Sequence, residues 1–251
     1  LEFVPGYRNE EIFEILERFE KFSLEDWSYT IDSLLNMESK NVLVRDALKQ
    51  YNSSAKFDPS DQARALQGYF SPGVYLIEDE TTLLDVLAAM LRTFLNSITD
   101  DLVGDAALQG LTIHQAVVLA SIVEREAFIP QEMPVVASVF LNRLERGMPL
   151  QSDATVQYAI ASDLASVEAH GWWKIRLQED ELMTMSPYNT FNVTGLPPGP
   201  IANPSFEALH AVIYPARSNH LFFLTSPACD GTHSFADTYI EHLQNADIFN
   251  N

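Results

Sequence analysis

Two glutamates flank an arginine at the end of an apolar run, in the sequence ASIVEREAF. On a helix each residue turns about 100° from the one before it. With Val123 at the centre of the apolar face, Glu126 lies about 60° from that centre, whereas Glu124 is nearer the flank and Arg125 points away. Burial raises the pKa of a carboxyl group, which suits it to general acid catalysis near neutral pH. Glu126 is therefore the candidate acid, and a salt bridge to an arginine such as Arg143 is the structural alternative.

A second carboxylate is the usual partner of such an acid in glycoside cleavage, at about 5 to 10 Å. Asp153, in the sequence LQSDATVQY, is one candidate. Glu124 is a poor one, because residues two apart on a helix diverge. Asp153 also stands where a helix over ATVQYAIA would need an N-cap, so capping is the alternative to catalysis at this position.

Motifs for other chemistries are missing from the sequence. The six histidines show no metal-ligand spacing, and the single Cys229 excludes both a CxxC pair and an intrachain disulfide. GxSxG, P-loop and GxGxxG motifs are also missing, so we expect neither a metal nor a cofactor. His233 in GTHSF, and the pair Trp172 and Trp173, could contact a substrate, with structural packing as the alternative for each.

Two helices are expected to carry the candidate residues. The segment LTIHQAVVLASIVEREAF is typical of a helix that Thr112 and Gln115 begin as a capping box and that ends before Pro130. A second helix is expected over residues 132–146, where Gly147 acts as the stop signal.

The N-terminal half is expected to be mainly helical. Helical patterns begin at Asn9, as an N-cap, and at Ser23, where Asp26 completes a weaker capping box, and they recur in NVLVRDALKQY and TTLLDVLAAMLRTFLNSI. The polar stretch TDDLVGDAALQG interrupts this pattern. We therefore place a domain boundary there, between a helical part over residues 1–106 and a second domain over residues 107–251.

Turns and strands follow the helices. Pro, Gly, Asn and Thr dominate SPYNTFNVTGLPPGPIANPS, which predicts an ordered loop without regular structure. HLFFLTSP and THSFADTYI are typical of two strands joined by a turn at Asp230 and Gly231. The sequence as a whole predicts an α+β protein.

Composition limits the partners of the chain. At 251 residues and 47% hydrophobic residues a buried core is expected. The 35 acidic and 15 basic residues give a net charge of −20, which repels phosphate backbones and anionic lipids, so nucleic acid is not an expected partner. Neither a bilayer-length apolar run nor a signal peptide is found in the sequence.

Five motifs occur in a fixed order: LASIVEREA, VASVFLNRLERGMPLQSDATVQYA, SPYNTF, TGLPPGPIANP and GTHSF. In order and spacing the chain resembles the endolytic murein transglycosylases of the YceG-like (MltG) family over residues 111–244, with LQGYFSPGVY as a looser match upstream. The resemblance implies a lysozyme-like catalytic domain that acts on peptidoglycan glycan strands. It also implies a place in the bacterial envelope, on the outer side of the cytoplasmic membrane, with a membrane anchor not seen in this sequence. Cell-wall synthesis enzymes are the implied protein partners.

The resemblance makes Glu126, the second glutamate of the E-x-E pair, the catalytic acid. The implied reaction is non-hydrolytic and leaves a 1,6-anhydro end on N-acetylmuramic acid. We expect the substrate to be bound by Gln151, Asp153, Tyr188, Asn189 and Thr190.

Several positions depart from the family pattern. Ala127 replaces the Ser or Thr that commonly follows the acid, Ala154 replaces a Pro, and Ser205 replaces a Gly. A hydroxyl at position 127 could orient the acid, so its loss leaves an inactive glycan-binding partner of wall-synthesis enzymes as one alternative. A hydrolysing muramidase that uses Glu126 with Asp153 is the other.

Overall fold

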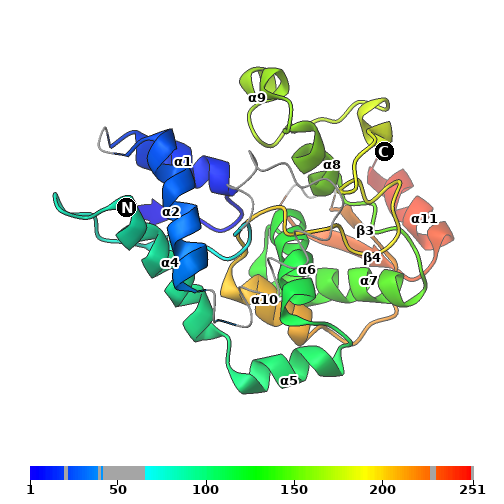
Figure 1. Ribbon diagram of the computed structural model, residues 1–251. Helices are drawn as coiled ribbons and strands as arrows, with labels where there is room; N and C mark the ends of the chain where they lie inside the picture. The colour runs from blue at the N-terminus through cyan, green and yellow to red at the C-terminus, as the bar shows by residue number, and fades with distance from the viewer. Residues whose placement is uncertain (20–21, 39–40, 42–65, 227–229, 250–251) are drawn as a thin grey trace. The chain divides into compact units, whose positions relative to one another are not determined.

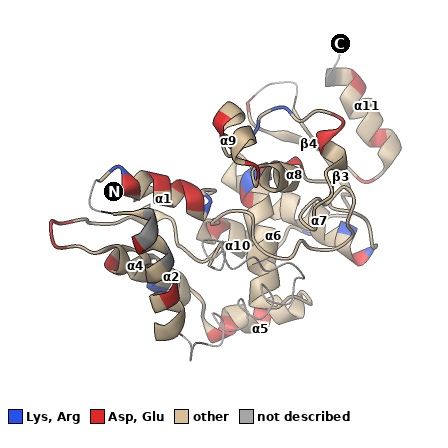
Figure 2. Ribbon diagram, turned by 45° about the horizontal axis from the view of Figure 1, so that its top comes forward, with Lys and Arg blue, Asp and Glu red and all other residues tan. Residues whose placement is uncertain are grey.

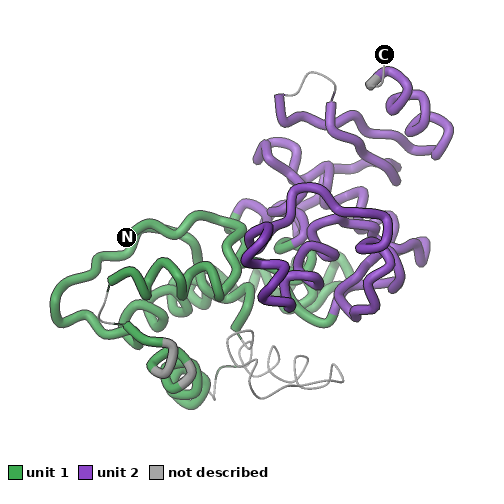
Figure 3. The backbone as a smooth tube through the Cα atoms, turned by 90° about the horizontal axis from the view of Figure 1, so that it is seen from above, with its two compact units in different colours: residues 1–121, 198–206 green, residues 122–197, 207–251 purple. Residues whose placement is uncertain are grey.

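The computed structural model describes residues 1–19, 22–38, 41, 66–226 and 230–249 (Figure 1). Within them the chain forms two compact units, which Figure 3 shows in different colours. Unit 1 holds residues 1–121 and 198–206, and unit 2 holds residues 122–197 and 207–251. The elements combine helices with two small antiparallel sheets, so the structure is of the expected α+β class.

Unit 1 is mainly helical. Its elements are β1 (Glu2–Phe3), α1 (Asn9–Glu17), α2 (Leu24–Met37), β2 (Gly73–Val74), α4 (Leu83–Ser97), α5 (Asp100–Leu108) and the first part of α6 (Ile113–Glu126). The predicted capping boxes are present at Ser23 and at Thr112. α1 begins one residue earlier than expected, because Arg8 is its N-cap and Asn9 its first helical residue. The helix predicted from NVLVRDALKQY lies almost entirely outside the described residues.

The core of unit 1 is built from the apolar stripes that the sequence predicted. The stripe of α4 is buried at Leu83, Leu87, Met90, Leu91 and Phe94. Aromatic rings join α1, α2 and the segment before β2: Phe13 lies 5.3 Å from Trp27, and Trp27 lies 6.3 Å from Phe70.

Asn203 links three segments of unit 1 that are far apart in the sequence. It is 1% exposed, and its Oδ1 accepts from the backbone N–H groups of Gly68 and Phe70 at 3.0 Å each. Its Nδ2 donates to the carbonyl oxygen of Tyr7 and to Oδ1 of Asn9. Because this amide bonds four groups, three of them in buried hydrogen bonds, the loop around residue 203 is fixed to the N-terminal segment.

The expected domain boundary at residues 106 and 107 falls inside α5, and the compact units divide instead within α6. The polar stretch that suggested a boundary is helical, and Thr99 caps its first turn by accepting from the N–H of Leu102 at 3.2 Å. Leu102 and Ala106 are buried on its inner side. Two buried apolar residues over two turns are too few for the sequence pattern to distinguish this helix from an irregular segment.

Unit 2 begins with the last turn of α6. It continues with η2 (Pro130–Glu132), α7 (Met133–Glu145), α8 (Asp153–Ile160), α9 (Leu164–His170), η3 (Glu181–Met183), α10 (Phe206–Ile213), β3 (Phe222–Thr225), β4 (His233–Ala236) and α11 (Tyr239–Phe249). α7 confirms the second predicted helix, and Gly147 follows it with φ of 65°. The Pro-rich loop over residues 186–205 has no helix or strand, as expected.

The two predicted strands form an antiparallel pair in which Phe222 faces Ala236 and Thr225 faces His233. The second strand is shorter than predicted, because α11 begins at Tyr239, within the segment expected to be extended. Figure 2 shows acidic residues spread over the helices of both units. In the described part of the chain no single helix is long and apolar enough to cross a bilayer, and the bent pair of α5 and α6 meets that test only when its two helices are taken together.

Candidate active site

Glu126 is the last residue of α6, and its side chain is partly exposed. Ser152, the N-cap of α8, donates from its Oγ to Oε1 of Glu126 at 2.5 Å. The backbone N–H of Ala154, in the first turn of α8, acts on the same carboxyl group as a second donor. The C-terminal end of a helix disfavours a carboxylate and an N-terminal end favours it. The carboxyl group of Glu126 is therefore exposed to opposing influences from α6 and α8.

Burial raises the pKa of Glu126 above its ordinary value. The hydrogen bond from Ser152 lowers it, the negative charge of Asp153 raises it, and the N–H of Ala154 and the charge of His233 lower it. Loss of hydration is the largest of these effects. Glu126 thus keeps its proton to a higher pH than an exposed glutamate, which is the property that a general acid needs.

Arg143 does not form the salt bridge considered as the structural alternative for Glu126. Its Nε donates to the carbonyl oxygen of Leu221 at 2.6 Å, and its Nη1 donates to that of Leu150 at 2.7 Å. The ion pairs between described residues do not include Glu126. Arg143 instead fixes the segment before Ser152 to Leu221, the residue before β3, and its charge also acts on Glu126.

Asp153 is the first helical residue of α8, so its expected role as the N-cap is wrong by one position. The cap residue is Ser152, whose hydroxyl bonds Glu126 and makes no capping bond. Asp153 reaches solvent, yet partial desolvation raises its pKa. A raised pKa makes a carboxylate a stronger base while it stays ionised, so Asp153 stays the candidate second carboxylate of the muramidase alternative.

Asn189 and Thr190 are buried, at 0% and 1% exposure, and their side chains bond within the protein instead of facing solvent as we expected. Asn189 Nδ2 donates to the carbonyl oxygens of Leu182 and Thr184 at 2.9 Å each. Thr190 Oγ1 accepts from the N–H of Ser152 at 3.1 Å. We therefore revise both residues from substrate binding to positioning: they shape the loop and hold Ser152 beside Glu126.

Gln151 and Tyr188 remain accessible to a ligand. Gln151 is exposed, and its φ of 51° is the one positive value among the described residues other than glycine. This conformation turns the chain immediately before Ser152. Tyr188 is partly exposed, and its ring lies 4.8 Å from that of Tyr158 on α8.

The other residues flanking Glu126 have structural contacts. The guanidinium carbon of Arg125 lies 3.9 Å from the ring centroid of Trp173, which gives that tryptophan a packing role. His233 pairs with Glu132, with Nδ1 and Oε2 2.8 Å apart. Within the described ranges no group of three or more His, Cys, Asp or Glu side chains is arranged to hold a metal ion.

Ser152 is the functional residue that the sequence did not single out. Its hydroxyl contacts Glu126 across 26 positions of sequence. Only its place before Asp153, as a possible cap, carried any local signal. Ala127, which lacks the hydroxyl expected after the acid, is 3% exposed, and Ser152 supplies a hydroxyl to the acid from a different element.

Comparison with known proteins places this geometry in context. The chain matches the YceG-like family over residues 1–248. It is 35% identical over 178 residues to an endolytic murein transglycosylase of Bacillus subtilis, covering 70% of this chain and 46% of the relative. A protein of the same name from Streptococcus pneumoniae is 28% identical over 224 residues, covering 87% of this chain and 39% of the relative. The chain thus spans less than half the length of these curated relatives.

A crystal structure of a yceG-like protein from Listeria monocytogenes has the same fold. It superposes with a TM-score of 0.77 at 27% identity, covering 97% of this chain and 75% of that one.

Proposed function

The chain belongs to the YceG-like family, and on this premise we propose that it cleaves peptidoglycan glycan strands as an endolytic lytic transglycosylase with Glu126 as its acid. The observation that carries the proposal is the environment of Glu126. Burial favours the protonated form of the group, while Ser152 and the N-terminus of α8 are placed to stabilise the carboxylate that forms when the proton leaves. The names of the curated relatives support the same reaction.

In the proposed reaction, Glu126 protonates the oxygen that joins N-acetylmuramic acid to N-acetylglucosamine. The bond from that oxygen to C1 of muramic acid breaks, and an oxocarbenium-like centre develops at C1. The Glu126 carboxylate then removes the proton of the C6 hydroxyl, whose oxygen closes on C1. The product is a 1,6-anhydro end, no water is consumed, and Glu126 regains its proton. One carboxyl group therefore performs both proton transfers.

The substrate is proposed to contact the accessible residues beside Glu126. Tyr188 offers a ring face and a hydroxyl, and Gln151 offers an amide next to the acid. Asp153, at the first turn of α8, can accept hydrogen bonds from sugar hydroxyls. We propose a lysozyme-like catalytic domain for this part of the chain. We further propose a site of action on the outer side of the cytoplasmic membrane, where the protein would meet glycan strands and the enzymes that synthesise them.

Product analysis tests the proposal. Purified glycan strands are digested with the wild-type chain, with Glu126→Gln and with Glu124→Gln, and the ends are identified by mass spectrometry. We expect anhydro ends, lighter than hydrolysed ends by one water molecule, from the wild type and Glu124→Gln. We expect none from Glu126→Gln, because a carboxamide is far too weak an acid to protonate the glycosidic oxygen. The residue two positions earlier serves as the matched control for loss of charge on the same helix.

Each other result identifies a different protein. Reducing ends in place of anhydro ends would establish a muramidase. Strand binding without cleavage by the wild type would establish a glycan-binding protein and refute both enzymatic assignments. Cleavage retained by a folded Glu126→Gln protein would show that the acid lies elsewhere.

A further inference from the structure

Gln151 is held in a strained backbone conformation directly before Ser152. Its φ of 51° lies in the left-handed region, where a Cβ atom crowds the backbone and which glycine occupies more readily. The hydroxyl of Ser152 bonds Glu126 at 2.5 Å, so the strained residue is one position from the group that contacts the candidate acid. Strain of this kind persists only where surrounding contacts enforce it, and it concentrates at functional sites.

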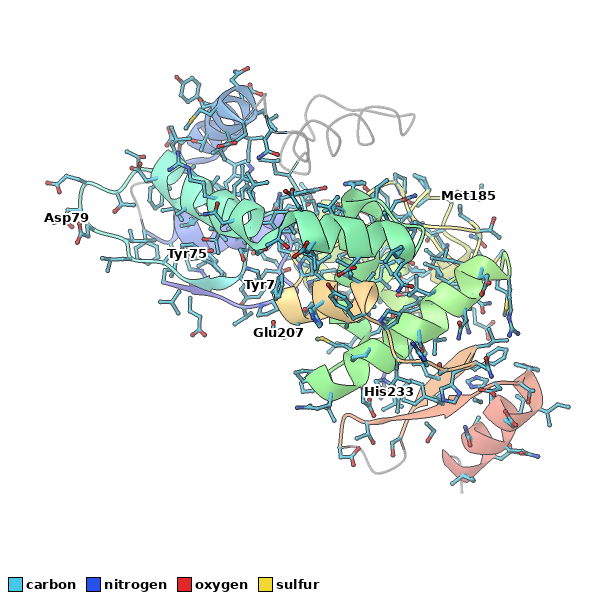
Figure 4. The ribbon with its side chains drawn as sticks, turned by 90° about the horizontal axis from the view of Figure 1, so that it is seen from below. Tyr7, Tyr75, Asp79, Met185, Glu207 and His233 are labelled. Carbon is cyan, nitrogen blue, oxygen red and sulfur yellow. The ribbon has the colours of Figure 1, made fainter. Side chains whose placement is uncertain are left out.

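The Pro-rich loop over residues 186–205 holds the backbone at Gln151. The carbonyl oxygen of Thr190 accepts from the N–H of Gln151 at 3.1 Å, and its Oγ1 accepts from the N–H of Ser152 at 3.1 Å. Met185, labelled in Figure 4, is 93% exposed just before this loop, whereas Thr190 is 1% exposed. The loop therefore runs from the surface into the interior, where it fixes the backbone of residues 151 and 152.

Arg143, from α7, orients the side chain of Gln151. Its Nη1 donates to the carbonyl oxygen of Leu150 at 2.7 Å and to Oε1 of Gln151 at 3.4 Å. A guanidinium group carries donors only, so the side-chain oxygen of Gln151 faces Arg143 and the Nε2 amide group is left for another partner. Gln151 is exposed, and its Nε2 donates to no other described residue. Two oriented N–H groups are thus available to a ligand beside Ser152.

We propose that Gln151 is a specificity residue whose Nε2 donates to the carbonyl oxygen of a 2-acetamido group on the glycan strand. This inference rests on the proposed function, and it names the chemical group by which the strand is recognised. The oriented amide offers donors, and the acetamido carbonyl oxygen offers lone pairs. An amino sugar without its acetyl group carries an ammonium group near neutral pH, which donates and cannot accept. Gln151 therefore favours N-acetylated strands over de-N-acetylated strands.

Substitutions at Gln151 test the inference through the ratio of kcat/KM on N-acetylated strands to kcat/KM on chemically de-N-acetylated strands. Gln151→Ala removes both donors, so the ratio should fall about 3- to 10-fold, the effect of one hydrogen bond between neutral groups. Gln151→Glu keeps an oxygen for Arg143 and places a second oxygen where the donors were, so the ratio should fall further, in favour of the ammonium-bearing strands. Gln244→Glu, at an exposed position on α11, is the matched control for added charge and should leave the ratio unchanged.

The backbone conformation of Gln151 supplies a test without substrate. Gln151→Gly and Gln151→Ala both lose the side chain, and only glycine relieves the positive φ. Gln151→Gly should therefore unfold at a higher urea concentration than Gln151→Ala, although both lose the preference for N-acetylated strands. Equal urea midpoints would refute the strain that the inference assigns to this residue.

Binding measurements separate this inference from the proposed function. The affinities for the two kinds of strand are measured in the Glu126→Gln background, where no cleavage is expected, with and without Gln151→Ala. An affinity ratio that depends on Gln151, in a protein whose wild type cleaves neither strand, would support acetamido recognition and refute the transglycosylase. An unchanged ratio in a folded Gln151→Ala protein, with activity retained or lost equally on both strands, would refute the recognition and leave Glu126 as the proposed acid.

Discussion

Ser152→Ala should slow the proposed reaction by removing one hydrogen bond from Glu126, the proposed catalytic acid. The substitution deletes the Oγ that donates to Glu126 Oε1 at 2.5 Å. The backbone bonds of residue 152 survive: its N–H still donates to Thr190 Oγ1, and its carbonyl oxygen still accepts from Thr155. The hydroxyl makes no capping bond to α8, so the helix loses no cap. The perturbation is therefore confined to the acid.

The size of the effect follows from how the bond changes during the reaction. In the proposed reaction, Ser152 donates to a neutral carboxyl group before the proton transfer and to a developing carboxylate in the transition state. A hydrogen bond to a neutral group contributes about 0.5 to 1.5 kcal/mol and one to a charged group about 1.5 to 3 kcal/mol. The difference of about 1 to 2 kcal/mol corresponds to a decrease in kcat of about 5- to 30-fold.

The assay is release of anhydro ends from glycan strands as a function of pH. Because the hydrogen bond from Ser152 lowers the pKa of Glu126, its loss should also move the basic limb of the profile to higher pH. Ser138→Ala is the matched control, since this serine is 3% exposed and its Oγ contacts Val135 and Ser218, away from the acid. A kcat equal to that of the control would refute the reasoning, and so would a loss as complete as in Glu126→Gln.

Two further predictions concern stability. Glu126→Gln should become progressively more stable than the wild type as the pH rises above about 4.5, the ordinary pKa of the group. Burial makes the native wild type hold a proton that the unfolded chain has lost, and the wild type therefore loses stability that the amide variant keeps. Urea denaturation at about pH 4 and about pH 7 should show the difference in unfolding free energy between the two proteins widening, and a constant difference would contradict the prediction. Asn203→Ala should destabilise the chain by about 3 kcal/mol or more, because it leaves the buried N–H groups of Gly68 and Phe70 without acceptors. Asn192→Ala, at an exposed position, is the control. Equal urea midpoints for the two variants would refute the role assigned to Asn203.

The elements that could be predicted from the sequence are those with strong local signals. α4 and α6 carry long apolar stripes with capping boxes at Thr82 and Thr112, so their extents follow from periodicity and hydrogen-bonding pattern alone. α5 could not be separated from a linker, because it has one capping threonine and few buried positions. The division of the units within α6 depends on which segments pack around that helix, and no local pattern contains this information.

For the site, the sequence determined which residue is the candidate acid and on which helix it lies. Periodicity placed Glu126 beside the apolar face, and the structure keeps it at the end of α6. The orienting hydroxyl could not be predicted, because Ser152 reaches Glu126 only after α8 and the loop that contains Thr190 have folded together. For the same reason, the burial of Asn189 and Thr190 reverses the role expected from their polar side chains.

The sequence by itself thus determined the chemistry available to this protein: a carboxyl group on a helix, a proline-stiffened loop and a histidine on a strand. Only the tertiary structure decided the state of that carboxyl group, because its proton affinity depends on water removed by packing and on charges from α7, α8 and β4. Desolvation and Coulomb interactions act through space, between residues that no sequence window contains together.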